Sequence, residues 1–130
     1  MSLTLPLFLE FLLQTQLGTR VEGRLYRPEE ELHAPHLLDV EICQTLRRLV
    51  RLGEMSAERA NEVIEDQMSL DLHRHPHLEL LMRAWALRGN ITSYDAMYVV
   101  LAEALDVPLI TCDAPLARVR GHQATVELVA

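Results

Sequence analysis

The chain has 130 residues, a formal net charge of −7, and 49% hydrophobic residues. This length fits one domain, and no apolar run reaches the roughly 18 residues that a membrane-spanning helix needs. The negative charge excludes a general nucleic-acid coat protein, because nonspecific affinity for phosphates comes from positive charge. We therefore expect a soluble cytoplasmic protein of one domain, which could still grip nucleic acid locally.

The first thirty residues are predicted to form one helix and a solvated connection. An apolar run over residues 5–17 fits the helix, and Gly18 or Gly23 is expected to interrupt the helical pattern after it. The acidic run at residues 29–31 is typical of a solvated surface. No strand is evident before the helix, so an N-terminal strand is expected to be truncated or missing.

The middle of the chain alternates between short apolar runs and longer stretches with helical periodicity. The predicted elements are a strand at 32–35, helices at about 37–52 and 57–68, a strand at 70–74 and a helix at 77–87. Gly53 is expected to end the first of these helices, and Ser56 is expected to cap the second. Trp85 lies among apolar residues of the last helix and is predicted to belong to the core.

The last third of the chain repeats this alternation. An almost wholly apolar helix begins near Ser93, followed by a buried strand at 108–113, a short helix at about 115–119 and a final strand at 124–129. Strands that alternate with helices indicate an α/β fold with a parallel sheet and helices on both faces.

Three acidic residues stand where predicted strands and helices meet. Asp95 lies in the first turn of the apolar helix, Asp113 ends a buried strand, and Glu41 lies near the start of its helix. Each has a structural explanation: a capping box with Thr92, an N-cap, and a favourable helix dipole, respectively. Carboxylates at strand ends and helix starts can also converge in one crevice, which favours a site for a hard metal ion.

Three segments together resemble the VapC-type toxins of the PIN-domain family. They are Asp39-Val-Glu41 before an apolar helix, residues 92–103 with Tyr-Asp-Ala, and residues 109–117 with Thr-x-Asp. The resemblance spans the chain from about Phe8 to Arg118. It implies a three-layer α/β/α fold and a metal-dependent endoribonuclease, a hydrolase usually encoded beside an antitoxin.

The resemblance also implies which residues form the site. Glu41, Asp95 and Asp113 match three acids of the family, and Thr111 matches the hydroxyl residue that accompanies the last acid. These four are the expected catalytic residues, with the three acids as ligands of Mg²⁺ or Mn²⁺. Four arginines near these acids are weaker candidates for contacts to substrate phosphates, or are ordinary solvated side chains. They are Arg47, Arg48, Arg118 and Arg120.

One position departs from the family pattern. The family opens on a strand that ends in an aspartate, and alignment of the first helix places Thr4 at that position. A wrong translation start, a leader that replaces native residues, or a degenerate copy would each explain the difference. A missing ligand weakens the placement of a metal ion, so we expect low or absent nuclease activity.

Partners and a competing function follow from the same resemblance. A VapB-like antitoxin is expected to insert an arginine or lysine among the acids, because a cation relieves their repulsion. A homodimer is expected as well, because Leu46, Leu49, Val50 and Leu52 cover more of the helix at 37–52 than one buried stripe needs, so that some of them pack against a second copy. The alternative function is a non-catalytic PIN-like module that pairs with itself or with an antitoxin.

Overall fold

The computed structural model describes residues 1–25, 27 and 29–129, and its centre is a five-stranded parallel sheet. The strand order is β3-β2-β1-β4-β5, and every neighbouring pair is parallel. The strands are β1 (Ser2–Leu3), β2 (His33–Pro35), β3 (His73–His75), β4 (Leu109–Thr111) and β5 (Val126–Leu128).

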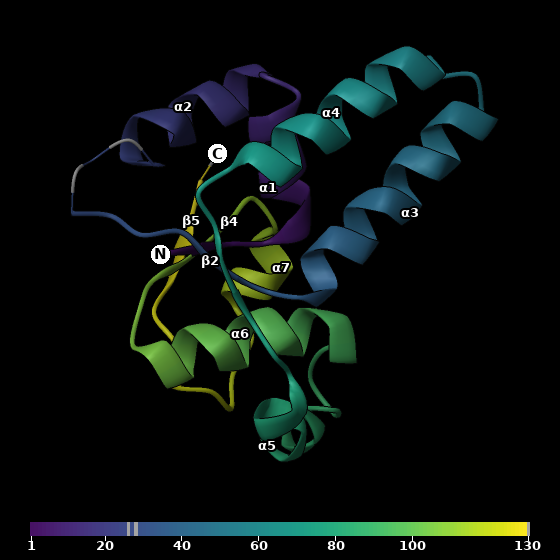
Figure 1. Cartoon of the computed structure of the whole chain (residues 1–130). Coiled ribbons are helices and arrows are strands. Elements are labelled where there is room, and N and C mark those ends of the chain that lie inside the picture. The colour runs from purple at the N-terminus through teal and green to yellow at the C-terminus, as the bar shows by residue number, and fades with distance from the viewer. Residues whose placement is uncertain (26, 28, 130) are drawn as a thin grey trace.

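Helices cover both faces of this sheet. They are α1 (Leu5–Leu12), α2 (Gln16–Leu25), α3 (Leu37–Arg51), α4 (Ala57–Ser69), the 3₁₀ turn η1 (Leu78–Leu80), α5 (Leu81–Ala86), α6 (Ser93–Leu105) and α7 (Ala114–Ala117). In Figure 1, α1 and α2 lie on one side of the sheet and α5 and α6 on the other. The predicted three-layer α/β/α architecture is therefore confirmed. None of the described helices is long and apolar enough to cross a membrane.

The N-terminal strand that the sequence pattern did not reveal is present in short form. The backbone N–H of Ser2 donates to the carbonyl of Pro108 at 2.9 Å, and that of Thr4 donates to the carbonyl of Ile110 at 3.1 Å. β1 lies between β2 and β4 and is wholly buried. The expectation of a missing strand was wrong, because two residues are too few to show any periodicity.

The α3–α4 hairpin follows the prediction closely. Gly53 has a φ of +72°, which ends α3, and the Ser56 hydroxyl accepts a hydrogen bond from the Arg59 backbone N–H at 3.1 Å. Of the apolar residues expected to divide between the core and a dimer surface, Leu46 is buried in the core. Leu52 from the same set is exposed and stays available to a partner.

The first helix was predicted as one element, but the structure divides it. α1 ends before Gln14, whose φ of +58° turns the chain, and both Gly18 and Gly23 lie inside α2. A Cβ atom added at Gly18 would lie 2.1 Å from the Glu10 carbonyl oxygen. Gly18 therefore permits close contact between the two helices rather than ending one of them.

The helix predicted at 77–87 is also shorter than expected, and Trp85 is not in the core. The side chains of Ala84 and Leu87 are buried, whereas Trp85 is 60% exposed. Leu78 and Met82 are exposed as well, so the apolar spacing here does not mark the buried face. A helix of six residues has room for only one buried stripe, and Trp85 lies outside that stripe.

The two glycines of α2 allow a matched test of the close helix contact. Gly18→Ala is expected to lower the free energy of unfolding by about 2 kcal/mol, because the added methyl collides with backbone. Gly23→Ala has no atom within 4 Å of the new Cβ and is expected to raise it by about 0.5 kcal/mol. Urea unfolding of both variants measures these changes, and equal effects of the two substitutions would contradict the assignment.

Candidate active site at the carboxyl edge of the sheet

The three predicted acids lie near the edge of the sheet where the parallel strands end. Asp113 follows β4, and Glu41 lies on α3, which follows β2. Helix α6 leads back into β4, so its first turn, which carries Asp95, lies at the same edge. This is the edge at which open parallel α/β sheets bind their ligands.

Two of the acids share one open crevice. Asp95 and Asp113 line it together with Arg88, Thr92 and Leu116, and its volume is about 590 Å³. Glu41 lines a neighbouring hollow of about 380 Å³, in which Tyr94 also lies. The structure thus places Asp95 and Asp113 in the same cavity and Glu41 in the adjoining one.

The structural roles expected of Asp95 and Asp113 are also real. The Thr92 hydroxyl accepts a hydrogen bond from the Asp95 backbone N–H at 3.2 Å, which caps α6. One carboxylate oxygen of Asp113 accepts from the Leu116 backbone N–H at 3.1 Å, which caps α7. These caps hold both acids at defined positions on short, well-packed segments, and such positioning is also what a ligand site requires.

The charges of the three acids affect one another. Burial raises the pKa of Asp95, and the negative charge of Asp113 raises it further. Burial likewise raises the pKa of Glu41, and Asp95 adds to this effect. The Tyr98 hydroxyl donates to Glu41 at 2.6 Å and partly offsets that increase. A neighbouring carboxylate thus raises the pKa of Asp95 and of Glu41, and a cation bound beside these acids would be stabilised.

The donor set fits a hard cation only in part. Carboxylate oxygens suit Mg²⁺ and Mn²⁺, and Mg²⁺ is usually held by one or two carboxylates together with waters and substrate phosphate. Asp95 and Asp113 can supply this minimum from one crevice. Across residues 1–25, 27 and 29–129, however, no three His, Cys, Asp or Glu side chains form a group that could hold a metal ion. Any ion must therefore be held by few protein ligands.

Thr4 lies where β1 ends and contributes no charge. Its side chain is 2% exposed, and its hydroxyl donates to the Thr111 hydroxyl at 3.1 Å. The Thr111 hydroxyl also accepts from the Asp113 backbone N–H at 3.0 Å. The end of the central strand is thus linked to Asp113 by two hydrogen bonds, and a neutral side chain stands next to the acids.

None of the four arginines that we predicted to contact phosphate is among the residues that line the crevice. Arg47 lines a groove between α3 and α4 instead, and Arg118 follows α7 as its C-cap. The arginine at the crevice is Arg88, which the sequence analysis did not single out. In the sequence, only its position four residues before Thr92 could have indicated that Arg88 lies near the site.

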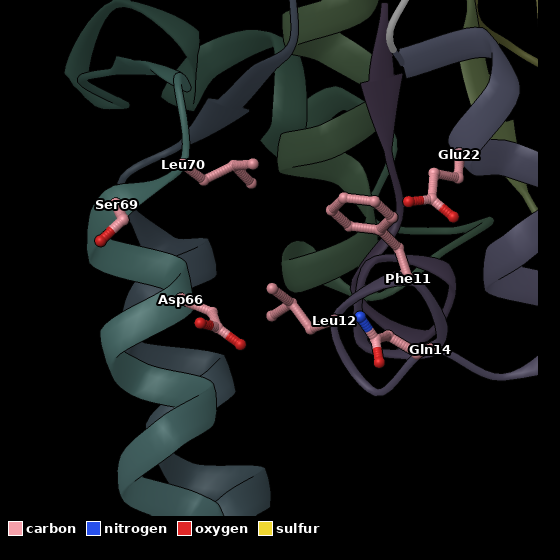
Figure 2. A pocket seen from close by; sticks show the side chains of 7 residues that line it. All are labelled: Phe11, Leu12, Gln14, Glu22, Asp66, Ser69 and Leu70. Carbon is pink, nitrogen blue, oxygen red and sulfur yellow. The ribbon is translucent and has the colours of Figure 1, made fainter.

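A second hollow lies among the helices, away from the strand ends. Its volume is about 280 Å³, and α1, α2 and the end of α4 surround it. Figure 2 shows the side chains of Leu12 and Leu70 pointing into this space and that of Ser69 pointing away from it. None of the four predicted catalytic residues lines it, so the crevice at the sheet edge is the better candidate site.

Three kinds of comparison relate the chain to known proteins. The sequence profile of the PIN domain family matches residues 7–122. The chain is 46% identical to Ribonuclease VapC1 of Mycobacterium tuberculosis over 98 residues, 75% of this chain and 74% of that protein. It is 41% identical to Ribonuclease VapC12 of the same organism over 121 residues, 93% of this chain and 92% of that protein. The crystal structure of PAE2754 from Pyrobaculum aerophilum superposes with a TM-score of 0.69 at 22% identity, over 96% of this chain and 81% of that one.

The electrostatic coupling of the acids can be measured directly. Asp113→Asn is expected to lower the pKa of Asp95, because it removes a nearby negative charge while asparagine still caps α7. A raised folded-state pKa means that stability falls as pH rises from 3.8, the ordinary pKa of Asp95, through its folded-state pKa. The substitution should lessen this loss.

Carbon-detected NMR titration of the Asp95 carboxyl, in the native chain and in the variant, provides the measurement. Asp106→Asn is the control, because Asp106 is the C-cap of α6 in the left-handed conformation, which asparagine tolerates. An Asp95 pKa that is unchanged by Asp113→Asn would show that the two acids do not interact.

Proposed function

The chain belongs to the PIN-domain family, in its VapC-type branch, and on this premise we propose that it is a metal-dependent endoribonuclease of a toxin–antitoxin system. The observation that carries the proposal is the crevice that Asp95 and Asp113 line together, in which the negative charge of Asp113 raises the pKa of Asp95. Two relatives that match most of the chain are named as ribonucleases.

Each residue of the site has a defined task under this proposal. Asp95 and Asp113 would hold a divalent ion, and Glu41 would add negative charge next to Asp95. Thr111 orients Asp113 through the hydrogen bond to its backbone N–H. Tyr98 fixes the Glu41 carboxylate by donating to it at 2.6 Å. A bound Mg²⁺ or Mn²⁺ would activate water and offset the charge that develops on the phosphate during hydrolysis.

Thr4 limits this activity. A threonine hydroxyl is a weak ligand compared with a carboxylate, and this one already donates to Thr111. A bound ion would therefore be held loosely, and a misplacement of about 1 Å can reduce the rate on the order of 100-fold. The competing function is a non-catalytic PIN module that persists by pairing with itself or with an antitoxin.

The proposed setting includes two protein partners in the cytoplasm. A VapB-like antitoxin would place an arginine or lysine in the crevice, where the three acids favour any cation. The same cation would compete with the metal ion and silence the nuclease. A second copy of the chain would pack on exposed apolar residues, of which Leu52 on α3 is one from the predicted set.

Metal-dependent cleavage tests the proposed activity. The native chain is expected to cleave single-stranded RNA slowly with Mn²⁺ and not at all with chelator, because the carboxylates need the ion. Asp113→Asn should abolish the cleavage while preserving the cap of α7. Asp106→Asn, remote from the crevice, should leave it unchanged. Cleavage that survives chelator, or that Asp113→Asn does not reduce, contradicts the proposed site.

Restoring the absent carboxylate distinguishes an impaired enzyme from a binding module. Thr4→Asp is expected to raise metal-dependent cleavage by on the order of 100-fold and to tighten Mn²⁺ binding in calorimetry. Thr4→Asn is the matched control, because asparagine has nearly the same shape as aspartate but carries no charge. If neither variant nor the native chain cleaves RNA with metal present, the nuclease function is wrong and the binding module is favoured.

A further inference from the structure

A tryptophan and an arginine form a cation–π pair, and the arginine of this pair lines the crevice. The guanidinium carbon of Arg88 lies 4.7 Å from the centre of the Trp85 ring, and one of its nitrogens donates to the Trp85 carbonyl at 3.1 Å. Arg88 also lines the crevice that contains Asp95 and Asp113. Arg88 therefore belongs both to the crevice and to the pair, whereas Trp85 is not among the residues that line the crevice.

The internal packing of the chain does not account for this pair. Trp85 is 60% exposed, so most of its ring gains nothing from the core. Arg88 has no carboxylate partner within ion-pair distance among the described residues, whereas the nearby Arg83 is paired with Glu103 at 2.8 Å. An unpaired guanidinium beside an exposed indole is available for a ligand with both a flat ring and a negative charge.

We propose that Trp85 and Arg88 form a nucleotide subsite, in which an unpaired RNA base stacks on Trp85 and the adjoining phosphate is held by Arg88. This subsite rests on the proposed nuclease function, since it would place the RNA strand next to Asp95 and Asp113. Proteins that hold single strands combine aromatic platforms with cationic grooves in this way. Each stacked base typically improves affinity roughly tenfold or more.

The pair also indicates which RNA is accepted. A base can stack on an exposed side chain only when it is free of its own helical stack, as in single strands, loops and bulges. The chain as a whole carries a charge of −7 and repels phosphates. A local guanidinium at the crevice therefore decides where the RNA backbone can approach the acids. Trp85 is therefore expected to take up only a nucleotide that is already unstacked.

The chain provides its own reporter for this subsite, because Trp85 is its only tryptophan. We would titrate the full chain, in chelator so that no cleavage occurs, with a single-stranded RNA dodecamer and follow tryptophan fluorescence. Stacking predicts a saturable decrease in fluorescence. A dodecamer of ribose phosphate without bases and the RNA annealed to its complement should each cause little decrease.

Substitutions at Trp85 and Arg88 separate stacking from charge. Arg88→Ala is expected to weaken RNA binding roughly tenfold, and Arg88→Lys should restore only part of this loss, because it keeps the charge without the planar group. Arg51→Ala removes an exposed arginine of α3 outside the crevice and should change nothing. Trp85→Ala, followed by anisotropy of labelled RNA, should weaken binding more than Trp85→Phe, because phenylalanine retains a ring.

The outcomes also separate this subsite from the proposed function. RNA that binds by anisotropy without changing the fluorescence, or an equal decrease with the base-free strand, overturns the subsite. No RNA binding at all also overturns it and instead favours an exposed apolar surface for a protein partner. A saturable, base-dependent decrease supports the subsite even if Thr4→Asp never cleaves RNA, in which case only the nuclease function fails.

Discussion

The position of β1 between β2 and β4 is the constraint on which the site depends. The backbone of Ser2 and Thr4 donates to the segment around β4, while the backbone of His33 in β2 donates to Met1 on the other side. These bonds align the strand ends, so that the segments after β1, β2 and β4 all leave the sheet at one edge. Because the acids lie on those segments and on α6, a two-residue strand determines whether they can approach one another.

The same arrangement makes Thr4 the most informative departure of this chain from the family pattern, in which an aspartate ends the first strand. Its hydroxyl is buried at the centre of the sheet edge and is linked through Thr111 to Asp113. With threonine at this position the strand end is packed and hydrogen-bonded, but the site has one negative charge fewer than an aspartate here would give. Fewer carboxylates lower the affinity for a divalent ion and also lower the repulsion among the acids that remain. The geometry and the charge of the site are thus separable.

The sequence predicted those features that depend on local chemistry. The hydroxyls of Ser56 and Thr92 cap their helices as predicted, and the apolar helix α6 is buried from Ala96 to Ala102. The sequence did not predict the features that depend on long-range contacts. Gly18 is needed because α1 and α2 touch there, and β1 is a strand only because β2 and β4 pair with it. Trp85 looked like core, yet its helix is too short to bury it, and Arg88 had no motif to mark it.

Diffraction at the manganese absorption edge from a crystal grown with Mn²⁺ would show whether Asp95 and Asp113 bind a metal ion. We expect an anomalous peak in the crevice, in contact with the carboxylates of Asp95 and Asp113, with waters in the remaining coordination positions of the ion. The Thr4 hydroxyl should remain bonded to Thr111 and take no part as a ligand. An empty crevice at millimolar Mn²⁺, or a peak only elsewhere on the chain, would contradict the assignment of these acids as a metal site.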